Sequence, residues 1–554
     1  MYLGQSMPYA RIDSDLSSTE GYGALVARHD LVRSILEFSS LVEGIHIFQA
    51  NAPRREEEDS VVGIAELQAE FGTERIRTVP ASHLLELTGV EDYIFLMHGV
   101  GLQQIGRARM AGIGPAYPVC TLMHSINAPN MLSSYVMALL LGEPYDSIVV
   151  TSEAGKIAME KLGDSAETFL KTRFRIPVQC QFPITKIPLG VDTKFLGRKD
   201  QARSRELLRL PLDKRILLYV GRLSESEKAD LEPLLDLMCS LRQEEFRAHL
   251  VLAGQDINGN YCRSLRAIAN DRGIGRDLTI IKNFPRLLKP WIFSAADVFV
   301  SPSDNIQETF GIAIVEAMAC GLPVIASDWS GYRDLVQAGE TGFLIPTLWW
   351  KDTPPRASRL APVSDAISVR HFLAQRTVVE PRHLREVVKT LLQDEQLRLR
   401  FGENGRRRAI NSFSWPVVVK QLEALWNDQQ SCFGDRRRRS EESTLPDYGE
   451  IFGSFVTESI NSQVALKRTP KPIELTRDVP AGICWEEASE RLRGWETHTL
   501  ARKLDTRPGG DSRDTLAWLW KKGYLELADD LLSSDLETED RTGREIGELE
   551  KTGR

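Results

Sequence analysis

Short apolar runs alternate with longer helix-forming stretches through the first 190 residues of the chain. Each run has the length of a strand, and a helix is predicted over residues 24–38, before the first run. Alternation of this kind is typical of a parallel sheet whose strands are joined by right-handed helical crossovers. The predicted strands are Gly44–Gln49, Tyr93–Met97, Pro118–Met123 and Asp146–Ser152.

The same alternation resumes after a loop around Gly190, whose glycine suits a tight turn, and continues to about residue 430. The loop places a domain boundary near residues 185–200, either as a hinge or as an ordinary connection. The sequence therefore predicts two α/β domains, over 1–190 and 191–430. Strands of the second are expected at Arg215–Val220, Ala248–Gly254, Leu278–Asn283, Val300–Pro302 and Val324–Ala326, with helices at Lys199–Leu210, Asp230–Leu241, Tyr261–Arg272 and Pro290–Asp297.

Two glutamates, Glu308 and Glu316, flank the start of a predicted helix in the second domain. Gly311 precedes its apolar run, and Gly321-Leu-Pro323 ends it. Carboxylates accept hydrogen bonds from sugar hydroxyls, and free amide groups at a helix start hold phosphate or an anomeric oxygen. The segment therefore suits a polyhydroxylated ligand, although a surface helix with two solvated glutamates fits the local pattern equally well.

Two cations stand at the end of the strand predicted at Arg215–Val220. Arg222 emerges at its C-terminal end, where ligands bind in open α/β sheets, and Lys228 follows at the head of the next helical stretch. An arginine offers a flat, multidentate fork and a lysine a point charge, so the pair can neutralise a diphosphate.

Together, Gly-Arg at a strand end, the nearby lysine and the spaced glutamates resemble the family 4 glycosyltransferases. That family has two facing Rossmann-like domains with parallel sheets, the GT-B fold. The resemblance spans about residues 1–430 and is most specific in its second half. It implies a retaining hexosyltransferase that moves a sugar from a UDP- or GDP-linked donor to an acceptor hydroxyl, on a saccharide, a lipid-linked molecule or a small molecule. It implies no cofactor and no essential metal, because the two cations take over charge neutralisation.

The resemblance also implies roles for single residues. His124, after the strand that ends at Met123, would lie near the donor sugar and share catalysis with Glu308; His98 is the second histidine candidate. In the family, the arginine and lysine are commonly one residue closer together than here. The matching positions are Arg222, Lys228, Gly21 and Gly23 for the diphosphate; Glu308 with the backbone of Phe310, Gly311 and Ile312 for the sugar; Glu316 for the ribose; and Lys282, Asn283 and Phe284 for the base.

Two alternatives remain. A phosphorylase with the same fold would need a lysine context for pyridoxal phosphate, which the sequence does not offer. A protein that keeps the fold without catalysis, and recruits partners through its C-terminal region, is disfavoured by the intact arginine, lysine and glutamates.

Composition agrees with an enzyme of the cytoplasm, with a peripheral position at a membrane left open. The chain has 554 residues, a net charge of −8 and seven cysteines without C-x-x-C spacing. An acidic chain offers no overall field for nucleic acid, and the cysteines suggest reduced thiols. No apolar stretch approaches the length of a membrane span, and the N-terminus lacks a signal series.

Two regions depart from the family pattern. An insertion is predicted near residues 346–380, where Trp349 and Trp350 could stack on a sugar or a partner, although local packing is favoured. After residue 430 the sequence predicts a linker (431–477), a tryptophan-rich helical module (478–536) that could bind a protein partner, and a charged disordered tail (537–554).

Overall fold

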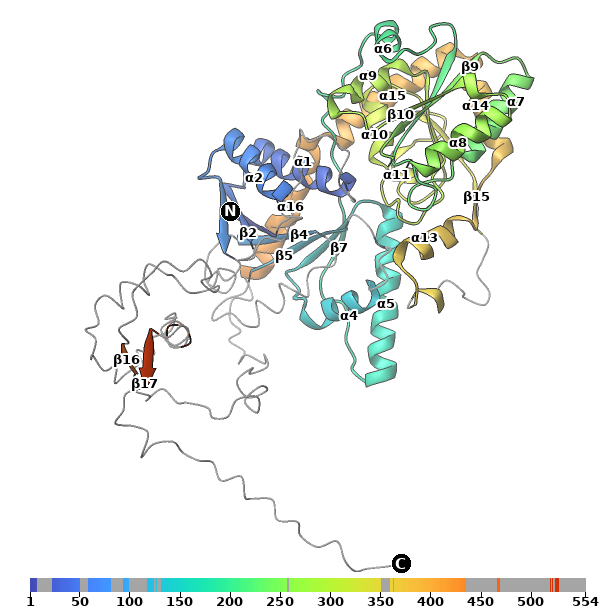
Figure 1. The fold of residues 1–554 in the computed structure, drawn as a ribbon. Helices are drawn as coiled ribbons and strands as arrows, with labels where there is room; N and C mark the ends of the chain where they lie inside the picture. Colours follow the sequence, from blue (N-terminus) through green and yellow to red (C-terminus); the bar gives the residue numbers. More distant parts are fainter. Residues whose placement is uncertain are drawn as a thin grey trace, which may run out of the picture. The chain divides into compact units, whose positions relative to one another are not determined.

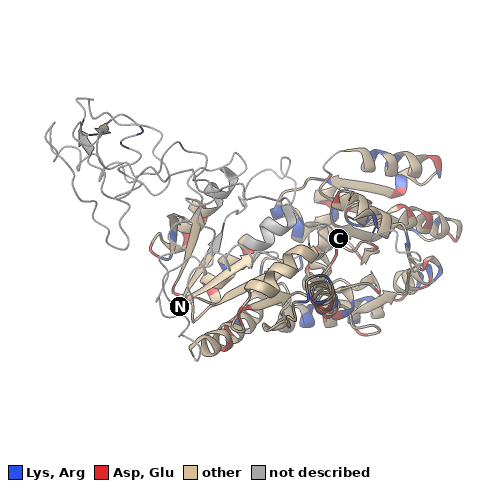
Figure 2. Ribbon diagram, turned by 90° about the horizontal axis from the view of Figure 1, so that it is seen from below, with Lys and Arg blue, Asp and Glu red and all other residues tan. Residues whose placement is uncertain are grey.

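The computed structural model divides the chain into two units, Met1–Thr444 and Leu445–Arg554. It describes residues 1–6, 22–49, 58–80, 93–98, 117–123, 126, 131–256, 259–349, 359–361, 363–434, 466–468, 519, 521 and 524–527. None of the helices among these residues is long and apolar enough to cross a bilayer. Basic and acidic residues are interspersed over these helices (Figure 2).

The first domain contains a seven-stranded parallel sheet in the order β3-β2-β1-β4-β5-β6-β7 (Figure 1). Its strands are β1 (Tyr2–Ser6), β2 (Gly44–Gln49), β3 (Ile76–Pro80), β4 (Tyr93–His98), β5 (Val119–Met123), β6 (Ser147–Val150) and β7 (Ile184–Lys186). Its helices are α1 (Tyr22–Phe38), α2 (Glu58–Phe71), α4 (Met131–Leu141) and α5 (Glu153–Phe174).

The four predicted strands of this domain are present, and β1, β3 and β7 are additional. β1 is central in the sheet but has one aliphatic side chain, that of Leu3. Its Gly4 leaves room for the Tyr93 ring, because a Cβ at this position would lie 2.4 Å from the Tyr93 hydroxyl oxygen. The sequence of β1 therefore carries little of the apolar pattern that predicts a strand.

The second domain contains a six-stranded parallel sheet in the order β10-β9-β8-β11-β12-β13. Its strands are β8 (Arg215–Val220), β9 (Ala248–Gly254), β10 (Leu278–Lys282), β11 (Val298–Ser301), β12 (Val324–Ser327) and β13 (Gly342–Ile345). Its helices are α6 (Gln201–Leu208), α7 (Glu232–Gln243), α8 (Asn260–Asp271), α9 (Lys289–Ala295), α10 (Ile312–Ala319), α11 (Tyr332–Leu335), α14 (Pro381–Gln393) and α15 (Glu395–Phe413). Alternate side chains of each strand enter the two apolar layers on the faces of the sheet.

The last long helix, α16 (Trp415–Gly434), returns to the first domain, as the family resemblance predicts. Trp415 and Trp426 are buried in the core that includes α1 and β1. Gly190, at the predicted domain joint, lies against the Trp415 ring, and a Cβ there would come within 2.3 Å of it. Phe433 packs on Tyr145 at a centroid distance of 5.1 Å, so the helix extends past the predicted limit of residue 430.

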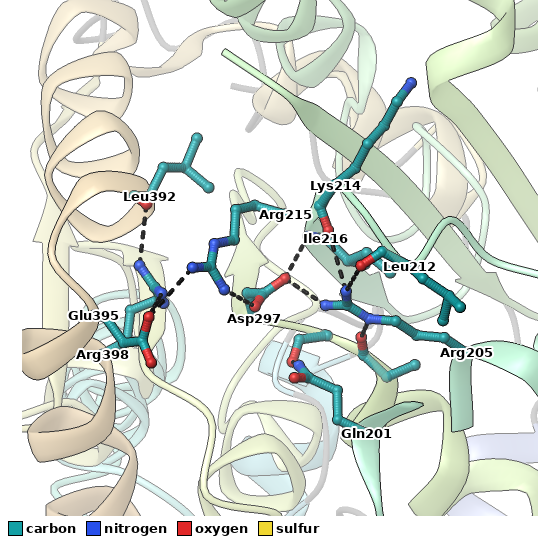
Figure 3. A network of polar contacts seen from close by, with 12 residues as sticks. Gln201, Arg205, Leu212, Lys214, Arg215, Ile216, Asp297, Leu392, Glu395 and Arg398 are labelled. Carbon is teal, nitrogen blue, oxygen red and sulfur yellow. Dashed lines mark hydrogen bonds and ion pairs between the residues drawn. The ribbon is translucent and has the colours of Figure 1, made fainter. Parts of the chain in front are cut away.

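A buried polar network lies at the N-terminal end of β8 (Figure 3). The guanidinium of Arg205 donates to Asp297 Oδ2 at 2.7 Å and to the carbonyl oxygens of Ala295, Leu212 and Lys214. Asp297 also accepts from the backbone amide of Ile216 at 2.6 Å and from Arg215 at 3.2 Å. The network joins α6 to the two central strands of the sheet.

The predicted insertion forms a small antiparallel pair, β14 (Thr347–Trp349) and β15 (Thr377–Val379), with helix α13 (Ala366–Ala374) between them. Trp349 stacks on Trp329 at a centroid distance of 5.7 Å and an interplanar angle of 21°. Trp349 thus packs on a neighbouring ring while 44% of it stays exposed, whereas Trp350 lies outside the described residues.

In the second unit, β16 (Leu466–Arg468) pairs antiparallel with β17 (Leu525–Leu527). β17 falls within the stretch predicted as helical, so that prediction is wrong for these three residues. The alternation Leu525-Glu526-Leu527 has the two-residue period of a strand, and Leu525 is buried. Most of the predicted helical module lies outside the described residues.

Candidate active site

The order of strands in the second sheet reverses between β8 and β11. The connection after β8 leads to β9 and β10 on one side, whereas β11, β12 and β13 extend on the other. In open α/β sheets, ligands bind outside the carboxyl ends of the strands at such a switch point. Arg222 and Lys228 follow β8 and Glu308 follows β11, so three of the predicted residues flank this point.

Arg222 is positioned by a close approach between two glycine backbones. A Cβ on Gly254 would lie 1.6 Å from the carbonyl oxygen of Gly221, so only glycine fits between the ends of β8 and β9. The Arg222 carbonyl oxygen accepts a hydrogen bond from the Tyr219 hydroxyl at 3.3 Å. The Arg222 guanidinium forms an ion pair with Glu227, from the same loop.

Lys228 and Glu308 form an ion pair across the switch point. Two hydrogen bonds hold the loop of Lys228 against the segment after β11: Ser303 Oγ donates to the Lys228 carbonyl oxygen at 3.1 Å, and Asn305 Nδ2 donates to the Ser226 carbonyl oxygen at 2.9 Å. The cation predicted for the diphosphate is therefore adjacent to the carboxylate predicted for the sugar.

Glu308 is fixed by a further partner that the motif does not include. Its Oε2 accepts from the Tyr332 hydroxyl at 3.3 Å, and Tyr332 also contacts Ser301 Oγ at 2.8 Å. Burial raises the pKa of Tyr332 well above its ordinary value, so this hydroxyl remains a donor at neutral pH. Gly311 has φ 103°, and a Cβ there would lie 2.4 Å from the Tyr332 ring.

Gly311 also opens α10 without a side-chain cap, which leaves the first amide groups of the helix available to a ligand. The Phe310 side chain is in the core and contacts Phe413 edge-on at 6.1 Å, so its contribution to a site is restricted to its backbone. Ile312 is the first residue of the helix.

Glu316 lies one to two turns into α10 and pairs with Lys289, the first residue of α9. Glu308 and Glu316 are 8% and 7% exposed, respectively. The interpretation of both as solvated surface glutamates is therefore wrong, because charged groups are buried only with partners. Lys289 was not predicted from the sequence.

The residues predicted for the base lie at the C-terminal end of β10, two strands from β8. Lys282 Nζ pairs with Asp256 Oδ2 at 3.0 Å, and Asn283 Oδ1 accepts from the Asp256 amide at 3.0 Å. Desolvation raises the pKa of Asp256, but the hydrogen bond from Lys282 and other contacts outweigh this effect and lower the pKa below its ordinary value. Asn283 has φ 47°, and Phe284 packs half-buried on the core. These side chains are engaged within the domain, and the role of the three residues toward a base stays a prediction.

The residues predicted in the first domain are only partly described. Gly21 and His124 lie outside the described residues, as does the His98 side chain, whereas Gly23 lies in the first turn of α1. The first sheet also reverses its order between β1, which precedes Gly21 and Gly23 in the sequence, and β4, which ends at His98. The roles of these residues stay predictions.

Residues 200–352, which include Arg222, Lys228, Glu308 and Glu316, match the family model "Glycosyl transferases group 1". The second domain belongs to this family. The site described above is therefore the strand-end edge of a group 1 glycosyltransferase domain.

Curated relatives of this domain include D-inositol 3-phosphate glycosyltransferases. That of Corynebacterium glutamicum is 28% identical over 301 residues, which cover 51% of this chain and 62% of the relative. That of Thermomonospora curvata is 36% identical over 190 residues, which cover 32% of this chain and 42% of the relative. The chain thus spans less than two thirds of the length of either relative.

Solved structures resemble both domains of the first unit. Anabaena Alr3699/HepE in complex with UDP-glucose has a TM-score of 0.53 at 16% identity, over 77% of this chain and 99% of that chain. Sucrose-phosphate synthase from Thermosynechococcus elongatus has a TM-score of 0.51 at 18% identity, over 78% of this chain and 99% of that chain. The predicted fold, GT-B, is confirmed.

Proposed function

We propose that the protein is a glycosyltransferase that transfers a sugar from a nucleotide-sugar donor to an acceptor hydroxyl with retention of configuration. The observation that carries this proposal is the ion pair between Lys228 and Glu308 across the switch point of a group 1 domain. In this pair, the cation that would bind the donor diphosphate lies beside the carboxylate that would bind the donor sugar.

The charges suit a donor whose leaving group is a diphosphate. Arg222, Lys228 and Lys289 each pair with a carboxylate at the strand ends. A diphosphate offers oxygens that Arg222 and Lys228 can bind as charge develops on the leaving group. The ribose hydroxyls can donate to Glu316, which keeps Lys289 as a second partner.

In the proposed mechanism, the acceptor hydroxyl attacks the anomeric carbon on the face from which the diphosphate departs, and a phosphate oxygen takes its proton. Arg222 and Lys228 stabilise the diphosphate. Glu308, oriented by Tyr332, and the amide groups of residues 310–312 hold the sugar in place. His124 would contribute from the first domain, near the donor sugar.

A uridine diphosphate donor is our first choice, supported by the UDP-glucose complex of the Anabaena relative in fold. A thermal-shift screen with UDP, GDP and their sugars tests it, since a ligand at about 100 times its Kd stabilises the folded protein by about 2.7 kcal/mol. Hydrolysis of the stabilising nucleotide sugar, measured beside Lys228→Ala as a control, tests catalysis. If neither UDP nor GDP binds at millimolar concentration, the proposal fails. Binding without turnover would instead favour a non-catalytic protein.

A further inference from the structure

The insertion helix α13 reaches the loop that carries Arg222 and Lys228. Arg370 Nη2 lies 3.7 Å from Glu227 Oε1, and His371 Nε2 lies 3.6 Å from Glu225 Oε1. Two adjacent side chains of the helix thus face two acidic residues of the loop. The start of the helix is fixed by Asp365, whose side chain accepts from the Ser368 amide at 2.9 Å.

Glu227 is shared by two arginines, one on each carboxylate oxygen. Arg222 pairs with Oε2 and Arg370 with Oε1. The side chains of Arg222, Glu227 and Arg370 are 19%, 17% and 11% exposed, so this carboxylate is not screened as a surface group would be. The two arginines are also close enough to repel each other, which Glu227 relieves.

Glu227 poses a problem for the proposed reaction. It pairs with the arginine that a diphosphate needs, and it directly precedes Lys228. A carboxylate here competes with the donor for Arg222 and repels the phosphates once Arg222 leaves it. Arg370 supplies a second cation that Glu227 can keep.

On the basis of the proposed function, we propose that Arg370 is a positioning residue that retains Glu227 and thereby frees Arg222 for the donor diphosphate. In the unbound protein Glu227 bridges the two arginines. On donor binding Arg222 exchanges Glu227 for a phosphate oxygen, and Glu227 stays with Arg370. The insertion thus acts on affinity for the donor without contacting it.

Titration of the full chain with UDP tests this proposal, with GDP titrated in parallel. Arg370→Ala should weaken UDP binding about tenfold, the loss that corresponds to one charge-assisted hydrogen bond, and should raise donor KM while kcat stays within about twofold. Arg370→Lys, which keeps the charge, should bind UDP within about threefold of the wild type. Arg382→Gln, an exposed charge change on α14, is the matched control and should bind UDP like the wild type.

Rescue separates this role from a structural one. Glu227→Gln should bind UDP at least as tightly as the wild type, and in the Arg370→Ala background it should restore binding to within about threefold. Wild-type binding by Arg370→Ala would overturn the proposal, as would a double variant as weak as Arg370→Ala alone. If wild-type protein binds neither UDP nor GDP, the proposed function itself fails, a result distinct from both.

Discussion

The two ends of β8 carry arginine–carboxylate clusters with different partners. At the N-terminal end, Arg205 and Asp297 are held by each other and by four backbone groups (Figure 3). At the C-terminal end, Arg222 pairs with Glu227, and Lys228 with Glu308, through side chains of loops. The Arg205 and Asp297 side chains are 8% and 4% exposed, whereas those of Arg222 and Glu227 are 19% and 17% exposed, so the second cluster is only partly buried.

The two clusters differ in which interactions must be broken before a charged side chain can exchange its partner. Backbone groups in a sheet and its crossovers cannot move without unfolding, so the Arg205–Asp297 pair is permanent. The loop carboxylates at the other end can be replaced by phosphate oxygens or hydroxyls at little cost in main-chain structure. In this protein, the ion pairs that we assign to the binding site are those whose charges are satisfied by loop side chains.

The largest effect is expected from Asp297→Asn, which leaves Arg205 and the Ile216 amide without their shared acceptor charge. Removing one partner of a buried ion pair costs about 3–5 kcal/mol, so the free energy of unfolding should fall by this amount. Urea unfolding measures it, with Glu206→Gln, an exposed charge change on α6, as control. A change below about 1 kcal/mol would show that the network is dispensable.

Lys228→Ala breaks the comparable pair at the other end, and there we expect a catalytic effect. Loss of one charge-assisted hydrogen bond to the diphosphate should lower kcat/KM by about 1.5–3 kcal/mol in transition-state stabilisation. The free energy of unfolding should change less than in Asp297→Asn. Steady-state kinetics with saturating acceptor test this prediction. An unchanged kcat/KM would show that Lys228 does not bind the donor.

Glu308→Gln and Glu316→Gln test the separate roles that we propose for the two glutamates at the C-terminal end of the sheet. Glu308 touches the reacting sugar in our mechanism, where charge develops, so its change should mainly lower kcat. Glu316 binds the ribose equally in the ground and transition states, so its change should mainly raise donor KM. Equal effects on both parameters in the two variants would contradict this division.

The last prediction concerns the pH dependence of stability and Asp304, a buried carboxyl after β11. Burial raises its pKa from the ordinary 3.8 to about 7. The folded state therefore binds this proton more tightly, and the stability it contributes is complete below about pH 3.8 and lost as the pH rises through 7. The asparagine in the variant Asp304→Asn cannot ionise. The difference in Tm between this variant and the wild type should therefore increase by a few degrees, in favour of the variant, from pH 4 to pH 7. A constant difference would contradict the raised pKa.

The apolar runs of the second domain were sufficient to predict β8, β9, β11 and β12, because these strands are buried on both faces. The edge strand β10 is only partly buried, but its apolar run was also predicted as a strand. β1 was missed because close packing against Tyr93 favours Gly4 over an aliphatic residue. In the site, the strand end at Gly221 predicted Arg222 and Lys228, and the helix that Gly311 opens predicted Glu308 and Glu316. Lys289, Tyr332 and Arg370 were not predicted as site residues, because each contacts the motif from another element and no local pattern records that contact.

The approach of Gly254 to Gly221 has a consequence for variation in this protein. A methyl group on Gly254 would displace the carbonyl oxygen of Gly221, and this displacement would pass along one peptide bond to Arg222. Residue 254 therefore influences the position of the Arg222 guanidinium, although it contacts no ligand in the proposed site. Because that Cβ would lie only 1.6 Å from the oxygen, the two strand ends would have to separate by more than an ångström, and donor binding would weaken although every charge in the site stayed in place.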